Sequence, residues 1–177
     1  MIELGQTGPR FALPGVDDKQ VDLADLLARH RAVAVIFSCN HCPYVRAWEG
    51  RMVEIQRDYA DKGVVLVAIN PNDTSRYPDD DVAHMQQRAQ EQGFNFPYLR
   101  DDSQDIARAY GGTHTPHVFL LDGDGVVRYR GAIDDNYDEP GAVQHAYLRD
   151  ALDAVLAGQT PPVADTKAVG CTIKWKQ

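Results

Sequence analysis

Cys39 and Cys42, two cysteines three positions apart, are the residues of this 177-residue chain most suited to chemistry. They follow the apolar run Ala32–Phe37, and an amphipathic stretch begins at Pro43. If the run is a strand and the stretch a helix, both sulfurs lie at a helix N-terminus. Unpaired backbone N–H groups and the helix dipole lower a thiol pKa there. The pair is therefore predicted to cycle between dithiol and disulfide, with no cofactor beyond the reversible Cys39–Cys42 bond.

The residue between the two thiols can set their redox behaviour. One thiolate attacks a substrate disulfide, and the second thiol resolves the mixed disulfide that forms. A protonated His41, together with the helix dipole, would stabilise the thiolate and therefore the reduced form, which makes the couple more oxidising. Non-catalytic metal binding or redox sensing is an alternative. Because no second Cys-x-x-Cys exists, a metal would require His114 or His117 beside the two thiols.

A strand–helix–strand unit is predicted to hold the pair in place. The unbroken apolar runs at 32–37 and 64–69 predict two buried strands, over 32–38 and 64–69. A helix is predicted over 43–61, because its apolar residues recur at helical spacing and Pro43 suits its first turn. Such a unit has parallel strands and a right-handed crossover. The sulfurs should therefore lie where the first strand meets the helix.

The rest of the chain shows no internal repeat and no domain boundary, so one domain is predicted over 1–177. Asp122-Gly123-Asp124-Gly125 predicts a hairpin between strands at 117–121 and 126–130. The tail over 159–177 is expected to be extended. Further helices are expected at 21–29, 80–92, 103–110 and 141–157.

The acidic clusters are predicted to be structural. Asp79-Asp80-Asp81 and Asp101-Asp102 precede helices, where negative charge is favourable. Asp122 and Asp124 lack the third ligand of a calcium-binding loop. Asp134 to Tyr137 follow the hairpin, where lining of a substrate groove is one interpretation and a solvated loop is the favoured one.

Composition limits the partners. The formal net charge is −8, whereas nucleic acids and anionic membranes require a basic face. No apolar run reaches the length of a membrane span and the first residues do not resemble a signal peptide, so a cytoplasmic location is expected. Three cysteines are too few for a disulfide scaffold. The expected partners are a disulfide-containing protein or a small-molecule thiol substrate, together with a reductant.

Several motifs together resemble one bacterial family. They are Ser38 to Val45, Thr113 to Pro116, Ile133 to Tyr137, Thr166-Lys167 and Gly170 to Trp175. These motifs resemble thioredoxin-like proteins of the AhpC/TSA (alkyl hydroperoxide reductase/thiol-specific antioxidant) superfamily, in its peroxiredoxin-like group. The resemblance implies an α/β thioredoxin-like fold, with a central mixed sheet flanked by helices. It also implies an N-terminal extension, a helical insert and an extended C-terminal tail.

The same resemblance implies roles for the site residues. In thioredoxin-like proteins the first cysteine of the pair is the exposed one, so Cys39 is expected to attack and Cys42 to resolve. A proline that leads into a strand at this point is normally cis, which would turn the Thr115 carbonyl toward the dithiol. Thr115, Pro116 and His114 are then expected to bind the substrate.

Two departures from related patterns bear on the chemistry. In peroxiredoxins the catalytic cysteine falls at Cys42, but Cys39 stands where their threonine should be and Val35 where their proline should be. The resemblance therefore favours disulfide exchange, with a thiol peroxidase using Cys42 as the alternative. Val33 occupies the place of the buried acid of thioredoxin, so His41, His114 or water must handle the proton, and His41 is favoured.

The third cysteine, Cys171, lies in the C-terminal tail, where Ile173 and Trp175 alternate with polar residues. One interpretation is a third redox thiol that reaches the active site. The other is a buried structural cysteine, which is favoured because free cysteines are among the most buried residues.

Overall fold

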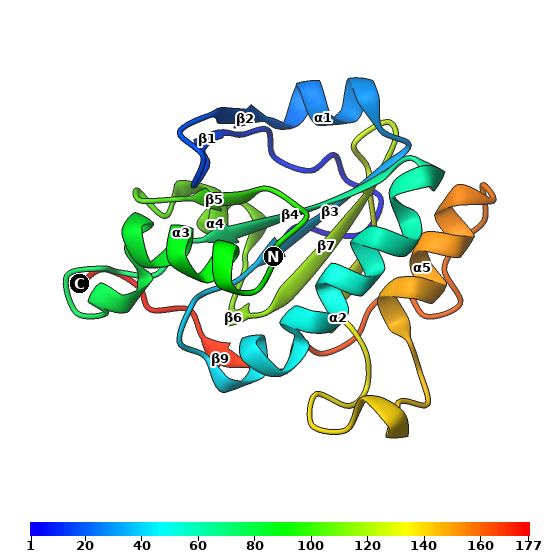
Figure 1. The fold of residues 1–177 in the computed structure, drawn as a ribbon. Helices are drawn as coiled ribbons and strands as arrows, with labels where there is room; N and C mark the ends of the chain where they lie inside the picture. The colour runs from blue at the N-terminus through cyan, green and yellow to red at the C-terminus, as the bar shows by residue number, and fades with distance from the viewer.

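The computed structural model describes residues 1–177. Its centre is a five-stranded mixed sheet in the order β5-β4-β3-β7-β8 (Figure 1). The middle strand, β3 (Ala32–Phe37), is buried at every position. It pairs parallel with β4 (Val64–Asn70) and antiparallel with β7 (His117–Asp122). The outer strands are β5 (Tyr98–Arg100) and β8 (Val127–Gly131).

Helices cover both faces of this sheet, because buried side chains alternate between the two faces of each strand. One apolar cluster joins α2, α3 and α5 to one face, and a second joins α1 and α4 to the other (Figure 1). None of the helices is long and apolar enough to cross a bilayer. The helices are α1 (Leu23–Arg29), α2 (Pro43–Tyr59), α3 (Val82–Glu91), α4 (Asp105–Tyr110) and α5 (Tyr147–Leu156). Short 3-10 turns are η1 (Ala60–Lys62), η2 (Pro78–Asp80) and η3 (Pro140–Ala142).

Two small sheets lie outside the central one. β1 (Ala12–Pro14) pairs with β2 (Gln20–Asp22), and β6 (His114–Thr115) pairs antiparallel with β9 (Cys171–Thr172). The second pair brings the C-terminal tail alongside the segment that precedes β7 (Figure 1). Apart from β9, the tail contains no regular element, in agreement with the extended tail that the sequence predicts.

The unit predicted around the cysteines is confirmed as β3, α2 and β4, and the predicted hairpin is confirmed as β7 and β8. The helix predicted over 141–157 is wrong in its first part, because α5 begins only at Tyr147. The residues before it run beside the loop that follows β8: Asp135 N–H donates to the carbonyl of His145, and Leu148 N–H donates to that of Ile133. These contacts replace the first turns of a longer helix.

Candidate active site

The two thiols lie between β3 and α2, as the sequence predicts. Cys42 is the N-cap residue of α2, and Pro43 opens the helix. Both cysteines are buried, with exposed fractions of 1% for Cys39 and 0% for Cys42. The expectation that Cys39 is exposed is therefore wrong for this structure. Cys39 packs with Val45, and the cluster is covered by Tyr44 and Cys171.

Thr115 contacts both thiols. The Thr115–Pro116 peptide bond is cis, as the resemblance implies. The Thr115 hydroxyl lies 3.4 Å from the Cys39 sulfur, and its carbonyl oxygen lies 3.4 Å from the Cys42 sulfur. Thr115 is fully buried. A single residue before the cis-proline therefore fixes the positions of both sulfurs.

Cys171 also reaches this site. In the β6–β9 pair Cys171 lies opposite Thr115, and its sulfur is 2.7 Å from the Cys42 sulfur. Cys171 is half-buried. The interpretation favoured from the sequence, a buried structural cysteine, is therefore wrong, because Cys171 is only half-buried and its sulfur contacts that of Cys42. A redox role for Cys171 stays a prediction.

Hydrogen bonds among the thiols shift the pKa values of Cys39 and Cys42 in opposite directions. The Cys39 thiol donates a hydrogen bond to Cys42, and this is the largest reason why the pKa of Cys42 is lowered to about 4. Burial opposes the shift, but Cys171 and the backbone N–H of Val45 also donate to that sulfur. The pKa of Cys39 is raised well above its usual value, first because it is the donor and then because it is buried. The two thiols therefore titrate as one coupled pair, in which the hydrogen bond from Cys39 favours the negative charge on Cys42.

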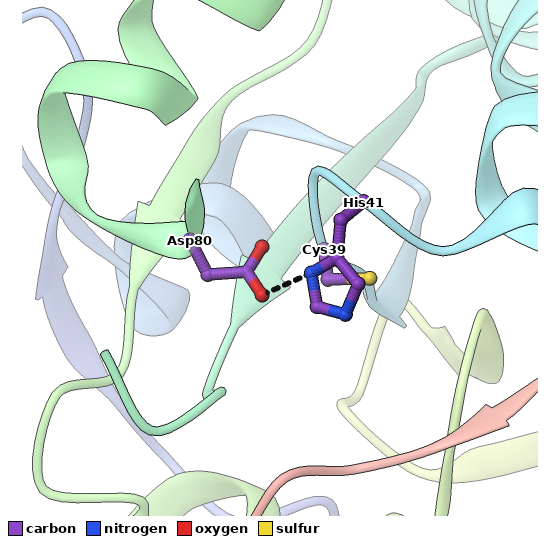
Figure 2. A group of neighbouring side chains, drawn as sticks. All are labelled: Cys39, His41 and Asp80. Carbon is purple, nitrogen blue, oxygen red and sulfur yellow. Dashed lines mark ion pairs between the residues drawn. The ribbon is translucent and has the colours of Figure 1, made fainter. Parts of the chain in front are cut away.

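His41 forms an ion pair with a carboxylate that sequence analysis did not assign to the site. Its Nδ1 lies 2.6 Å from Asp80 Oδ2, and Figure 2 shows Cys39 next to this pair. The hydrogen bond with Asp80 raises the pKa of His41, although burial opposes it. The His41 side chain is 28% exposed, whereas that of Asp80 is fully buried. The raised pKa therefore favours the protonated form of His41 beside the dithiol, while its partner Asp80 stays in the interior.

Asp80 is held by further donors. Its carboxylate accepts hydrogen bonds from Asn40 N–H at 2.7 Å, from the Asn70 amide at 3.2 Å and from the Asn72 amide at 3.1 Å. Burial alone would raise the pKa of Asp80, but His41 and these donors outweigh it, so the pKa lies below its usual value. The carboxylate therefore joins the loop before α2 to the residues after β4.

The acidic triplet has two different roles. Asp81 is the N-cap of α3, where its carboxylate accepts from His84 N–H, as the sequence predicts. Only one residue can occupy that position, and η2 turns Asp80 inward toward Asn40. The sequence signal for a separate role of Asp80 was that three consecutive aspartates precede one helix, which needs only one N-cap residue. The interpretation of Asp80 as a simple helix-terminal charge is therefore wrong.

Asp134 is a second correction among the acidic residues. It is buried, not solvated: it accepts from the Trp48 indole N–H at 2.9 Å and pairs with Arg51 at 2.8 Å. These contacts attach the loop after β8 to α2. Asp101 behaves as predicted, because its carboxylate accepts from Ala107 N–H in the first turn of α4.

The histidines proposed as metal ligands do not join the cysteines. His117 is buried, its Nδ1 accepts from Thr113 N–H, and burial lowers its pKa to about 4. His114 Nδ1 contacts the Thr113 hydroxyl at 2.8 Å. Another set, Cys39, His41 and Asp80, has donor atoms within 4.8 Å of one another (Figure 2). Because protein donors already occupy both Asp80 oxygens, a metal would have to displace them; metal analysis of untagged protein tests this.

A dithiol at the start of α2, facing a cis-proline loop beside a mixed five-stranded sheet, defines the class of thioredoxin-fold oxidoreductases. Comparison with known proteins agrees with this class. The chain belongs to the AhpC/TSA family, whose sequence model matches residues 4–130. The chain is also similar to the thiol-disulfide oxidoreductase ResA of Bacillus thuringiensis (strain Al Hakam). The two are 28% identical over 126 residues, which cover 71% of this chain and 68% of ResA.

Solved structures support the same fold. An uncharacterized conserved protein from Geobacillus kaustophilus superposes with a TM-score of 0.92 and 40% identity. The match covers 99% of this chain and 94% of that one. The thioredoxin domain of a thiol-disulfide oxidoreductase from Bacteroides vulgatus superposes with a TM-score of 0.61 at 18% identity, covering 72% of this chain and 86% of that domain. The thioredoxin-like α/β fold predicted from the sequence is thus confirmed.

Proposed function

We propose that the protein catalyses thiol–disulfide exchange through Cys39 and Cys42. The observation that supports this most is the contact of Thr115 with both sulfurs at the N-terminus of α2. The proposed substrate is a disulfide in a protein or a small molecule, and a separate thiol reductant restores the dithiol. ResA, to which the chain is similar, carries the name of this activity. The cytoplasmic location and the lack of a cofactor stay predictions.

The proposed order of events follows the sequence: Cys39 attacks and Cys42 resolves, while the loop at cis-Pro116 orients the substrate. The Cys39 thiol must first lose its proton, and the hydrogen bond that it donates to Cys42 provides the route. An incoming strand that replaces Cys171 also removes one of the contacts that lower the pKa of Cys42. Displacement of the tail therefore favours transfer of the proton from Cys39 to Cys42.

His41 and Asp80 take the place of the buried acid that the strand lacks at Val33. Asp80 contacts Nδ1 of His41 and keeps the imidazole protonated, which leaves Nε2 for proton exchange near Cys39. Asp80 is a positioning residue, because it acts through His41. The positive charge on His41 stabilises the thiolate form of the dithiol, and the reduced state with it.

Equilibration with glutathione tests the proposed function. We expect a reversible two-electron Cys39–Cys42 couple with a reduction potential above that of thioredoxin, about −270 mV. His41→Gln should lower the potential by about 30 mV, a tenfold change in the equilibrium constant, because the thiolate loses the favourable charge interaction with a protonated His41. Mass spectrometry after alkylation identifies the paired cysteines.

The outcome that contradicts the proposal is the lack of any Cys39–Cys42 disulfide in oxidising glutathione buffers. A potential below that of thioredoxin, or one unchanged in His41→Gln, contradicts only the role of His41. Asp79→Asn is the matched control, because the Asp79 side chain is 75% exposed and lies next to Asp80 in the sequence.

A thiol peroxidase is the second candidate, because the low pKa of Cys42 at a helix N-terminus suits a peroxide-reactive thiolate. The side chain three residues earlier is the Cys39 thiol, not the hydroxyl that peroxiredoxins use. Stopped-flow oxidation by hydrogen peroxide separates the two functions. A rate no faster than that of a free thiol rules out the peroxidase, and antioxidant activity of this kind with it.

A further inference from the structure

Cys171 is the one cysteine of the three that is not buried. It stands in β9, opposite Thr115 of β6, and Thr115 itself contacts Cys39 and Cys42. The Cys171 sulfur reaches Cys42 at 2.7 Å, whereas a disulfide bond is about 2.05 Å long. A small movement of either side chain therefore suffices to join the two sulfurs.

The tail holds Cys171 in this position from both sides. After it, the buried Ile173 donates its N–H to the Thr113 carbonyl at 3.0 Å. Lys174 donates its N–H to the Asn72 side chain at 2.9 Å.

On the other side of Cys171, Gly170 lies so close to β6 that an added Cβ would be 2.1 Å from the Thr115 carbonyl oxygen. Cys171 is thus placed by an ordered strand, not carried on a loose tail.

Building on the proposed function, we propose that Cys171 is a third redox thiol that exchanges with Cys42, and that β9 occupies the position of a substrate strand. An extended partner that pairs with the edge of β6 brings its residue opposite Thr115 to the same sulfur. The protein thereby contains an internal substrate, and the disulfide can move between Cys39–Cys42 and Cys42–Cys171.

The exchange conserves atoms and electrons. The Cys171 thiolate attacks the Cys42 sulfur of the Cys39–Cys42 disulfide, a Cys42–Cys171 bond forms, and the Cys39–Cys42 bond breaks. Cys39 leaves with the electron pair and takes up the proton that Cys171 gave up. Cys171 is oxidised, Cys39 is reduced, and no outside oxidant or reductant is required.

The proton balance between the sulfurs favours this direction of transfer. The hydrogen bond to Cys42, the largest cause of the raised Cys39 pKa, is lost when Cys42 is in a disulfide with Cys171. Burial and the nearby Asp80 carboxylate still raise the pKa of Cys39, so the released thiolate favours taking up a proton. Burial and the hydrogen bond to Cys42 raise the pKa of Cys171 to about 11. The second of these causes disappears when Cys42 is in a disulfide and carries no charge, so Cys171 then ionises more readily.

The test uses the full chain with Cys39→Ser, oxidised with diamide, alkylated and mapped by mass spectrometry. We expect an intramolecular Cys42–Cys171 disulfide and no free thiol. Recovery of both cysteines alkylated, or only in intermolecular disulfides, overturns the proposal. In case that variant does not fold, wild-type protein quenched during oxidation must show Cys42–Cys171 peptides beside Cys39–Cys42 peptides, and their absence has the same meaning.

A control moves the thiol by one residue. In the Cys39→Ser/Cys171→Ser/Thr172→Cys variant the thiol lies on the other side of β9, because strand side chains alternate. We expect disulfide formation with Cys42 to slow at least about tenfold; an equal rate overturns the argument from register. Separately, Cys171→Ser must still form Cys39–Cys42 in glutathione buffers, and a failure there contradicts the proposed function.

Discussion

Replacement of Cys39 by serine is expected to abolish the reduction of insulin-type disulfides. Without the attacking sulfur no mixed disulfide with substrate forms, and turnover falls to the rate of the reductant alone. Cys42→Ser should instead accumulate mixed disulfides on Cys39, because the resolving thiol is missing. Both effects are measured by insulin turbidity and by mass spectrometry of alkylated protein.

The opposite trapping result in these two variants would exchange the roles of Cys39 and Cys42. If Cys39→Ser traps substrate and Cys42→Ser does not, then Cys42, whose lowered pKa favours the thiolate, is also the attacker. Turnover that survives in Cys39→Ser contradicts the dithiol mechanism altogether. Cooperative thermal unfolding of each variant confirms that lost activity is not lost structure.

Asp80→Asn is expected to lower the free energy of unfolding by about 3 kcal/mol, because it removes the fully buried carboxylate of a partly buried ion pair. The amide also points donors at groups that donate to the carboxylate, namely Asn40 N–H and the Asn72 side chain. Urea unfolding measures the loss. Asp79→Asn, on an exposed side chain, should stay within about 0.5 kcal/mol of wild type.

The loss in Asp80→Asn should depend on pH. The pKa of Asp80 is lowered by folding, so its contribution is present above the unfolded value of about 3.9 and lost as pH falls through the folded pKa. The pKa of His41 is raised, so its contribution is complete below about 6.5 and lost as pH rises through the folded pKa. The difference from wild type should therefore be larger near about pH 5.5 than near about pH 8.5.

An NMR titration of His41 separates positioning from packing. In Asp80→Asn the pKa of His41 should fall, because its hydrogen-bonded carboxylate is the largest cause of the shift. An unchanged His41 titration contradicts the positioning role of Asp80, even if the variant is less stable.

The elements near the cysteines could be predicted from the sequence because their signals are local. β3 and β4 are unbroken apolar runs, and α2 has one apolar face behind Pro43. The short strands were missed because β5, β6 and β9 have two or three residues each, too few for a period to show. The first part of the predicted helix before α5 failed because loop contacts with His145 override local propensity.

The contacts of Cys171 and Asp80 in the site could not be predicted, because they depend on the tertiary structure and not on local sequence. Cys42 and Cys171 are 129 positions apart, and only the tertiary path of the tail brings them together. Asp80 required the turn of η2, because sequence alone does not say which of three aspartates caps α3. The expectation of an exposed Cys39 failed for the same reason as the interpretation of Cys171: β9 covers the dithiol.

The pairing of β6 with β9 has a consequence for partner selection. A strand tethered in the same chain competes at an effective concentration on the order of millimolar. A partner strand at micromolar concentration must then bind β6 about a thousandfold more tightly than the tail does to occupy half of the molecules. The tail therefore excludes weakly binding polypeptides from the edge of β6. Small thiols need no strand position, so they still reach Cys171.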